Sequence, residues 1–339
     1  MKKLFAVIAI AVLVLSGCSN NGEETPVIVK VGTASYTSVS GREFDAATPK
    51  DGRIQVNTYF ATVALDADGK VVYVDIDAAQ NEGTFDGEGA IVKAEAVPTK
   101  TEKEFDYGMV GASGIGKEWF EQMAALEEWM IGKTAAEVLA METMVKDDAH
   151  PKVPNEEDLK SSVTINVGDY LTVFEKAVAN AVEVEGVAKI GSGSSTSVSG
   201  RAYDAETAKE GRIQVNVTFA GVAVDADGKI LYVDIDVAQN QGTFDAEGKV
   251  LAAEAAKSKK EKGFEYGMVG ASGIGKEWFE QMAALEEWMT GKTVSEALAL
   301  DVDEEAVPTN EDLTSSVTIG VDGYLAALEK ANANVVVLP

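Results

Sequence analysis

The stretch YGMVGASGIGKEWFEQMAALEEWMIGKT at residues 107–134 occurs twice in the chain. It returns at residues 266–293 with a single substitution, and flanking segments return at the same offset of 159 residues. A repeat of this length is a whole domain, because solenoid units are much shorter. We therefore predict two tandem homologous domains, at residues 28–181 and 182–339.

The part of each copy that precedes this stretch has the pattern of β-strands. Residues 53–65 (RIQVNTYFATVAL) are rich in β-branched and aromatic side chains, and residues 71–77 (VVYVDID) alternate apolar with polar ones. The segment DADG between them is typical of a hairpin turn. The first half of each domain is therefore predicted to be an antiparallel sheet.

The part that follows is helical in pattern. Apolar residues recur at helical spacing from Lys117 onward, and Gly132 stands where a C-terminal cap is expected. Thr134 predicts a capping box for a second helix. Residues 163–167 are expected to form a short strand and residues 170–181 a further helix. Strands followed by packed helices predict an α+β fold for each domain.

Composition limits the possible functions. The chain has 339 residues, of which 46% are hydrophobic and 25% charged, which is typical of globular proteins and excludes a multi-span membrane protein. Its formal net charge of -27 disfavours nucleic acid as a partner. One Cys and one His in the chain exclude internal disulfides, thiolate zinc sites and Cys-ligated iron–sulfur clusters, and we predict no metal site. Any redox function would depend on an organic cofactor.

The N-terminal sequence has the pattern of a signal peptide. Two lysines precede a run of twelve apolar residues, and the segment closes on Ser-Gly-Cys. This ending is similar to a bacterial lipobox, which implies a signal peptide at residues 1–17, a diacylglycerol on Cys18, and a polar tether at residues 18–27. We expect a protein anchored in the lipid membrane through Cys18, on the extracellular face of the cell membrane. The alternatives are an ordinary secreted protein, and release of part of the signal as a hydrophobic peptide.

A glycine-rich loop lies between the two halves of each copy. The pattern places the start of a helix directly after Gly111, Ala112 and Ser113. The free amides at a helix start favour a negative group such as phosphate. Gly270, Ala271 and Ser272 repeat them. The alternative is that each serine only caps its helix.

The loop resembles the motif that bacterial flavin transferases recognise, in which an acid precedes Gly-Ala and then Thr or Ser. Asp106 and Glu265 match the acid, and Ser113 and Ser272 match the hydroxyl residue that accepts FMN. Ser replaces the commoner Thr in both copies, Glu replaces Asp in the second, and Met109 and Met268 stand where a hydroxyl residue is frequent. The Glu265 departure makes the second copy the weaker match.

The layout of signal, tether and duplicated domain resembles the PplA-type flavinylated lipoproteins with FMN-binding domains of Gram-positive extracellular electron transfer. The resemblance implies FMN joined by a phosphoester to Ser113 and Ser272. If FMN is attached there, Tyr107 and Tyr266 are the candidates to flank its isoalloxazine ring. It also implies an electron carrier rather than an enzyme. A flavin transferase would attach FMN, a membrane-bound reductase would donate electrons, and ferric iron or a quinone outside the cell would accept them. The rival hypothesis is a redox-silent surface lipoprotein that binds a ligand or acts as a spacer.

Overall fold

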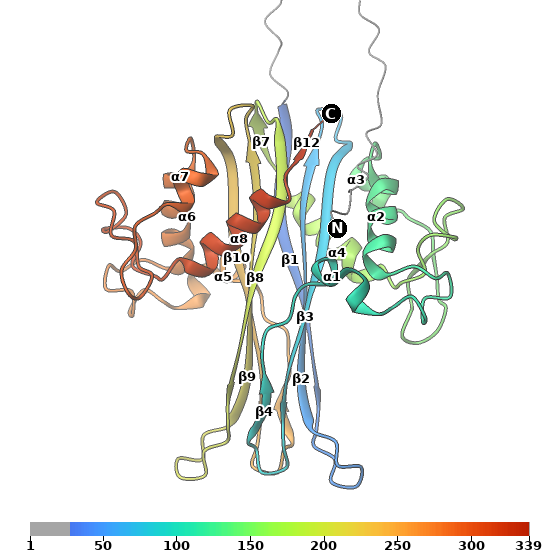
Figure 1. The fold of residues 1–339 in the computed structure, drawn as a ribbon, viewed down its shortest axis with the longest axis vertical. Coiled ribbons are helices and arrows are strands. Elements are labelled where there is room, and N and C mark those ends of the chain that lie inside the picture. The colour runs from blue at the N-terminus through green and yellow to red at the C-terminus, as the bar shows by residue number, and fades with distance from the viewer. Residues whose placement is uncertain (1–27, 339) are drawn as a thin grey trace, which may run out of the picture.

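The computed structural model describes residues 28–338, and it is an α+β protein built on two antiparallel sheets (Figure 1). Each sheet has five strands, in the orders β4-β3-β2-β1-β7 and β11-β10-β9-β8-β12. The strands of the first sheet are β1 (Ile28–Arg42), β2 (Gly52–Leu65), β3 (Val71–Phe85), β4 (Ile91–Ala94) and β7 (Val182–Glu185). Those of the second are β8 (Lys189–Arg201), β9 (Gly211–Val224), β10 (Ile230–Phe244), β11 (Val250–Ala252) and β12 (Val336–Val337).

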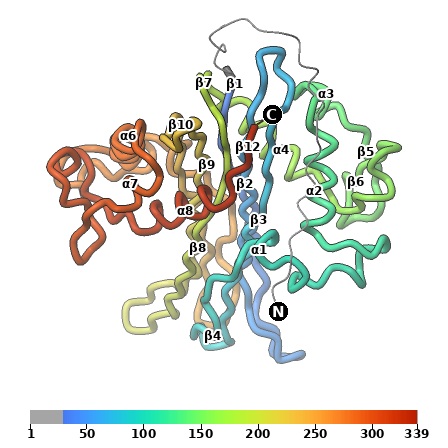
Figure 2. The backbone as a smooth tube through the Cα atoms, turned by 45° about the horizontal axis from the view of Figure 1, so that its top comes forward, coloured from blue at the N-terminus to red at the C-terminus, as the bar shows by residue number. Residues whose placement is uncertain are grey.

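Helices follow the strands in both halves, and they cover the outer faces of the two sheets, as Figures 1 and 2 show. The first half has α1 (Lys100–Lys103), the 3₁₀ helix η1 (Glu104–Tyr107), α2 (Trp119–Met130), α3 (Ala135–Leu139) and α4 (Gly168–Ala179), with a small hairpin of β5 (Thr143–Met144) and β6 (Val153–Pro154). The second half has α5 (Lys259–Lys262), η2 (Gly263–Tyr266), α6 (Trp278–Met289), α7 (Val294–Leu298) and α8 (Asp322–Ala333).

The burial pattern of β2 explains how the layers form. Its first residues alternate between buried and half-buried, because one face meets the other sheet and the opposite face is uncovered. From Tyr59 to the end of the strand every residue is buried, because helices cover the second face there. One strand therefore contributes to two hydrophobic cores.

The inner faces of the two sheets pack against each other. Phe85 of β3 and Phe244 of β10 stack with ring centroids 3.7 Å apart, and both are fully buried. Ile54 and Ile213 occupy the space over Gly242 and Gly83, where an added Cβ would come within 2.6 Å of the isoleucine side chain. Besides a core under its own helices, each half thus contributes to a third core that the two halves share.

Most local expectations are confirmed. Residues 66–69 form the turn between β2 and β3, α2 ends just before Gly132 with φ of +79°, and Thr134 makes the capping box with Glu137. The predicted helix at 170–181 is α4. The strand boundaries are wider than expected, since β3 continues to Phe85.

Two expectations differ from the structure. Residues 163–167 form no strand: Val163 and Val167 are fully buried beneath the helices, and Val163 N donates to Leu159 O in a turn. Apolar and polar residues alternate in this segment because its valines pack into the core from a turn, and this alternation resembles that of a strand. The division between residues 181 and 182 precedes β7, whose strand pairs with β1, so the first sheet extends to Glu185.

The expected signal peptide at residues 1–17, the tether and Cys18 lie outside the described residues. Within residues 28–338, no helix combines the length and the apolar composition needed to cross a bilayer.

Candidate functional site

The two Gly-Ala-Ser loops lie on opposite sides of the molecule. Each connects a 3₁₀ helix to a longer helix, η1 to α2 and η2 to α6, and α2 and α6 lie on the outer sides of different sheets (Figure 1). The two candidate sites are thus separate, and each is formed by its own half of the chain.

A buried glutamate holds each loop in shape. The carboxylate of Glu118 accepts hydrogen bonds from Met109 N at 2.9 Å and Val110 N at 3.0 Å, and the side chain is 1% exposed. Burial raises the pKa of Glu118, but donation from these N–H groups outweighs it and keeps the pKa below its usual value. Glu277 makes the same contacts with Met268 and Val269. The acid is therefore a structural part of the loop.

Ser113 is not at the start of the helix, in contrast to the expectation. The N-cap of α2 is Glu118, whose N–H donates to Glu121 Oε2 at 2.8 Å. Five residues therefore lie between Ser113 and Trp119, the first residue of the helix. Helix capping by the serine is excluded for the same reason. Instead, Ser113 Oγ accepts from Lys117 N at 3.0 Å and donates to Val110 O at 3.3 Å. The serine closes the loop on itself.

The second serine has the same bonds and a more accessible side chain. Ser272 Oγ accepts from Lys276 N at 3.0 Å and donates to Val269 O at 3.3 Å. Ser272 is half-buried, whereas Ser113 is only 6% exposed. The copy with the weaker sequence match therefore has the more accessible hydroxyl.

The amides that follow each serine have no hydrogen-bond acceptor in the described chain. Among the described residues, none accepts a hydrogen bond from the N–H groups of Gly114, Ile115 or Gly116. Gly114 and Gly116 have φ of +71° and +69°, while the residue between them does not have positive φ. Alternation of this kind turns successive N–H groups toward one concave surface that suits an anion. Gly273 and Gly275, each with φ of +68°, repeat the arrangement.

Room for an external group is present beside the serines. Gly111 and Ala112 are exposed, and a Cβ added to Gly111 would meet nothing within 4 Å. The same is true of Gly270, and Ala271 is likewise exposed. No part of the described chain requires glycine at these two positions, so the space is open to a ligand.

The acid and the tyrosine of the motif line a neighbouring cavity. Asp106 and Tyr107 border a cavity of about 300 Å³ beside the sheet, together with Lys103. Glu265, Tyr266 and Lys262 border the equivalent cavity of about 430 Å³. The serines are not among the residues that line these cavities in the described chain. The structure thus separates the predicted residues into a serine loop and a tyrosine cavity on the same side of each half.

Sequence reasoning missed the lysines that surround the tyrosines. Lys100 Nζ lies 5.1 Å and Lys103 Nζ 6.0 Å from the ring centroid of Tyr107, within the range of cation–π contacts. Burial lowers the pKa of Lys100 to about 8. Lys259 and Lys262 have the same positions over Tyr266. Each tyrosine ring thus has two lysine side chains within cation–π range in a strongly acidic protein.

It also missed the residues that fix the serine loop to the core. Thr164 Oγ1 donates to Ser113 O at 3.0 Å, and Thr164 N donates to Gln122 Oε1 at 2.8 Å. Gln122 is fully buried on α2. The segment that was expected to be a strand is therefore what positions the loop, and no local pattern could have indicated this.

Comparison with known proteins gives one partial match. A chlorophenol reductase of Desulfitobacterium hafniense is 36% identical over 95 residues, which make up 24% of this chain and 29% of that protein. This chain thus spans less than a third of that relative. No family model matches the chain, and no solved structure matches it.

Proposed function

We propose that this chain is an extracellular electron carrier that holds one FMN on each half, attached through phosphate to Ser113 and Ser272. The observation that carries the proposal is the set of three N–H groups directly after each serine, for which residues 28–338 provide no acceptor. A phosphodiester on Oγ would lie next to them, and an anion is the group they suit. We also propose that the two halves are tandem homologous domains, because the sequence of one recurs in the other.

The residues present fit the flavin. The N–H groups of Gly114, Ile115 and Gly116 would hold the phosphate, and the open side of Gly111 leaves it room. Tyr107, with Lys103 beside it, would contact the ring system in the neighbouring cavity. FMN, when bound, supplies the capacity to accept and release electrons. The chain itself binds and orients the group.

Attachment requires an activated donor and a change at Ser113. A flavin dinucleotide would provide the phosphorus: the Oγ–P bond forms, the phosphoanhydride bond breaks, the nucleoside monophosphate leaves, and the hydroxyl proton passes to a base of the flavin transferase. Ser113 Oγ must first give up its bond to Val110 O and become accessible. We therefore expect attachment to be faster at Ser272, which is more exposed.

The lipid anchor on Cys18 completes the proposed role. It would keep the carrier at the extracellular face of the membrane, within reach of a membrane-bound reductase. Ferric iron or a quinone would then receive the electrons. A covalent bond suits this location, because a dissociated cofactor is lost to the medium. The second candidate function, a redox-silent lipoprotein that binds a ligand or acts as a spacer, predicts a colourless protein.

Intact mass tests the attachment sites. The full chain is co-expressed with a flavin transferase, and the mass is measured for wild type, Ser113→Ala, Ser272→Ala and the double variant. We expect two FMN groups on wild type, one on each single variant and none on the double variant. Ser40→Ala, at an exposed serine on β1, is the control and should retain both. Flavin that persists in the double variant would refute these attachment sites.

A further inference from the structure

Two further cavities lie between the halves of the molecule, and they correspond through the repeat. The Asp75 cavity, of about 430 Å³, is lined by residues that include Asp75, Asp77, Glu127 and Ser194. The Asp234 cavity, of about 500 Å³, is lined by the equivalent residues of the other half, which include Asp234, Asp236 and Glu286. Neither serine lines these cavities in the described chain, and the proposed flavin chemistry does not use them.

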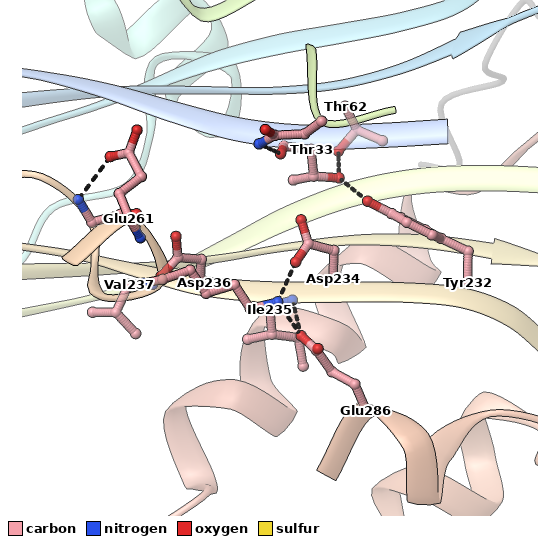
Figure 3. Close-up of polar contacts among 12 residues, drawn as sticks. Thr33, Thr62, Tyr232, Asp234, Ile235, Asp236, Val237, Glu261 and Glu286 are labelled. Atoms are coloured by element: carbon pink, nitrogen blue, oxygen red, sulfur yellow. Dashed lines mark hydrogen bonds and ion pairs between the residues drawn. The ribbon is translucent and has the colours of Figure 1, made fainter. Parts of the chain in front are cut away.

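The Asp234 cavity contains a cation from the chain itself. Lys260 Nζ is paired with Asp234 Oδ1 and, at 2.6 Å, with Glu286 Oε1. Figure 3 shows Asp234 and Glu286 converging on one point from β10 and α6. These carboxylates raise the pKa of Lys260 above its usual value in spite of the burial that lowers it. An ammonium group is thus the occupant that this arrangement of carboxylates accommodates.

In the part of the chain that the structure describes, the Asp75 cavity has the carboxylates without a lysine that pairs with them. Thr101 stands at the position of Lys260, as its backbone shows: Thr101 N donates to Asp77 Oδ1 at 3.1 Å, and Lys260 N donates to Asp236 Oδ1 at 3.0 Å. The Thr side chain ends far short of where the lysine ammonium lies. Glu127 Oε1 accepts from Ile76 N at 2.7 Å, just as Glu286 Oε1 accepts from Ile235 N at 2.7 Å. The two carboxyl groups of the site are therefore preserved and in place, while burial raises the pKa of Asp75 to about 6 and that of Glu127 above its usual value.

The other lysine that borders the Asp75 cavity is already paired. Lys330 Nζ contacts Glu102 Oε1 at 2.5 Å at the edge of the cavity. Its counterpart Lys176 pairs with Glu261 in the same way at 2.6 Å. Because both cavities have this peripheral pair, the difference between them is the missing cation at Thr101.

A serine provides an independent indication of a ligand. Ser194 is 3% exposed, and its Oγ is buried without any hydrogen-bond partner in the described chain. Ser192, two residues earlier on β8, donates to Asp75 Oδ2 and so faces the cavity. Residues two apart on a strand share a face, so Ser194 faces the cavity as well. A buried hydroxyl without a partner is costly unless a ligand or water satisfies it.

We propose that the Asp75 cavity binds a small organic amine whose ammonium group takes the place that Lys260 Nζ has in the other half. Asp75 and Glu127 would accept its N–H donors, and Ser194 Oγ would be a further acceptor. The cavity is larger than an ammonium group needs, and Phe60 and Val336 provide apolar surface for a short carbon chain. Among the described residues, no three carboxylate, His or Cys side chains have the arrangement of a metal site, which favours an organic cation.

The test is isothermal titration of the full chain with butylamine and 1,4-diaminobutane, with 1-butanol as the neutral isostere. We expect one amine site per chain and no binding of butanol. Thr101→Lys supplies the ammonium internally and should weaken amine binding by about tenfold or more. Asp75→Asn should weaken it as well. Lys260→Thr recreates the Asp75 cavity in the other half and should raise the number of sites to two.

The outcomes separate this proposal from its alternatives. Amine binding that Thr101→Lys leaves unchanged would overturn it, as would binding of calcium or magnesium chloride with no binding of either amine. Absence of a second site in a folded Lys260→Thr variant would also contradict it. The Asp75→Asn and Lys260→Thr arms remain informative if Thr101→Lys fails to fold. None of these results depends on FMN attachment, because Ser113 and Ser272 are intact in every variant.

Discussion

Replacing Lys260 with Met tests how strongly the two halves depend on the ion pairs in the Asp234 cavity. Lys260 contacts two carboxylates, and removing one partner of a fully buried pair costs about 3–5 kcal/mol. The side chains of Lys260, Asp234 and Glu286 retain 28%, 21% and 15% exposure, so water compensates part of the loss. We expect the free energy of unfolding to fall by about 2–3 kcal/mol near pH 8.

The loss should depend on pH in a defined direction. Burial raises the pKa of Glu286 and raises that of Asp236 to about 6. A carboxyl whose pKa is higher in the folded state destabilises that state above the folded pKa, and the penalty disappears as the pH falls toward the unfolded value. Without Lys260 the pKa of Glu286 rises further. The deficit of Lys260→Met should therefore be largest near pH 8 and smaller near pH 5.

Urea unfolding at these two pH values, with wild type in parallel, measures the effect. Lys249→Met is the control, because Lys249 is exposed, and its unfolding free energy should change by less than about 0.5 kcal/mol. A deficit for Lys260→Met that is the same at both pH values would refute the reasoning, as would a deficit near pH 8 no larger than that of a surface ion pair, about 0.5 kcal/mol.

Three other substitutions examine the shared core and the serine loop. Phe85→Ala removes the ring that stacks on Phe244, so the free energy of unfolding should fall by about 3–5 kcal/mol in a single urea transition. Two separate transitions would contradict a shared core. Gly116→Ala introduces strain at φ of +69° and should lower stability by about 1 kcal/mol, which thermal unfolding measures. Glu118→Gln replaces one of the two acceptor oxygens with a donor, so hydrogen exchange at the Met109 or the Val110 amide should become faster; unchanged exchange at both would show that the carboxylate does not hold the loop.

The sequence predicted those parts of the fold that local chemistry determines. Residues 66–69 formed the expected turn and Thr134 the expected capping box, because the few residues that decide each structure are adjacent. The packing of one sheet on the other was not predicted. Alternation in β2 shows that one face is buried, but it cannot indicate whether a helix or a second sheet covers it. Residues 163–167 failed as a strand because buried turns can alternate too.

The candidate site was predicted only in part, because residues distant in the sequence help to form it. The density of glycines around Ser113 indicated an open loop, and the loop is open. Glu118 had the appearance of an ordinary exposed helix residue, yet it is the buried acceptor that shapes the loop. Thr164 acts from 51 residues away. The difference between Thr101 and Lys260 was visible in the aligned repeats, but its consequence required the cavity around it.

The most direct test of the central claim is a peptide mass map of the protein isolated from its own cell envelope, with its visible absorption spectrum. The account predicts a yellow protein in which the peptides that contain Ser113 and Ser272 each have the added mass of FMN. A colourless protein in which both peptides have their unmodified mass would contradict it.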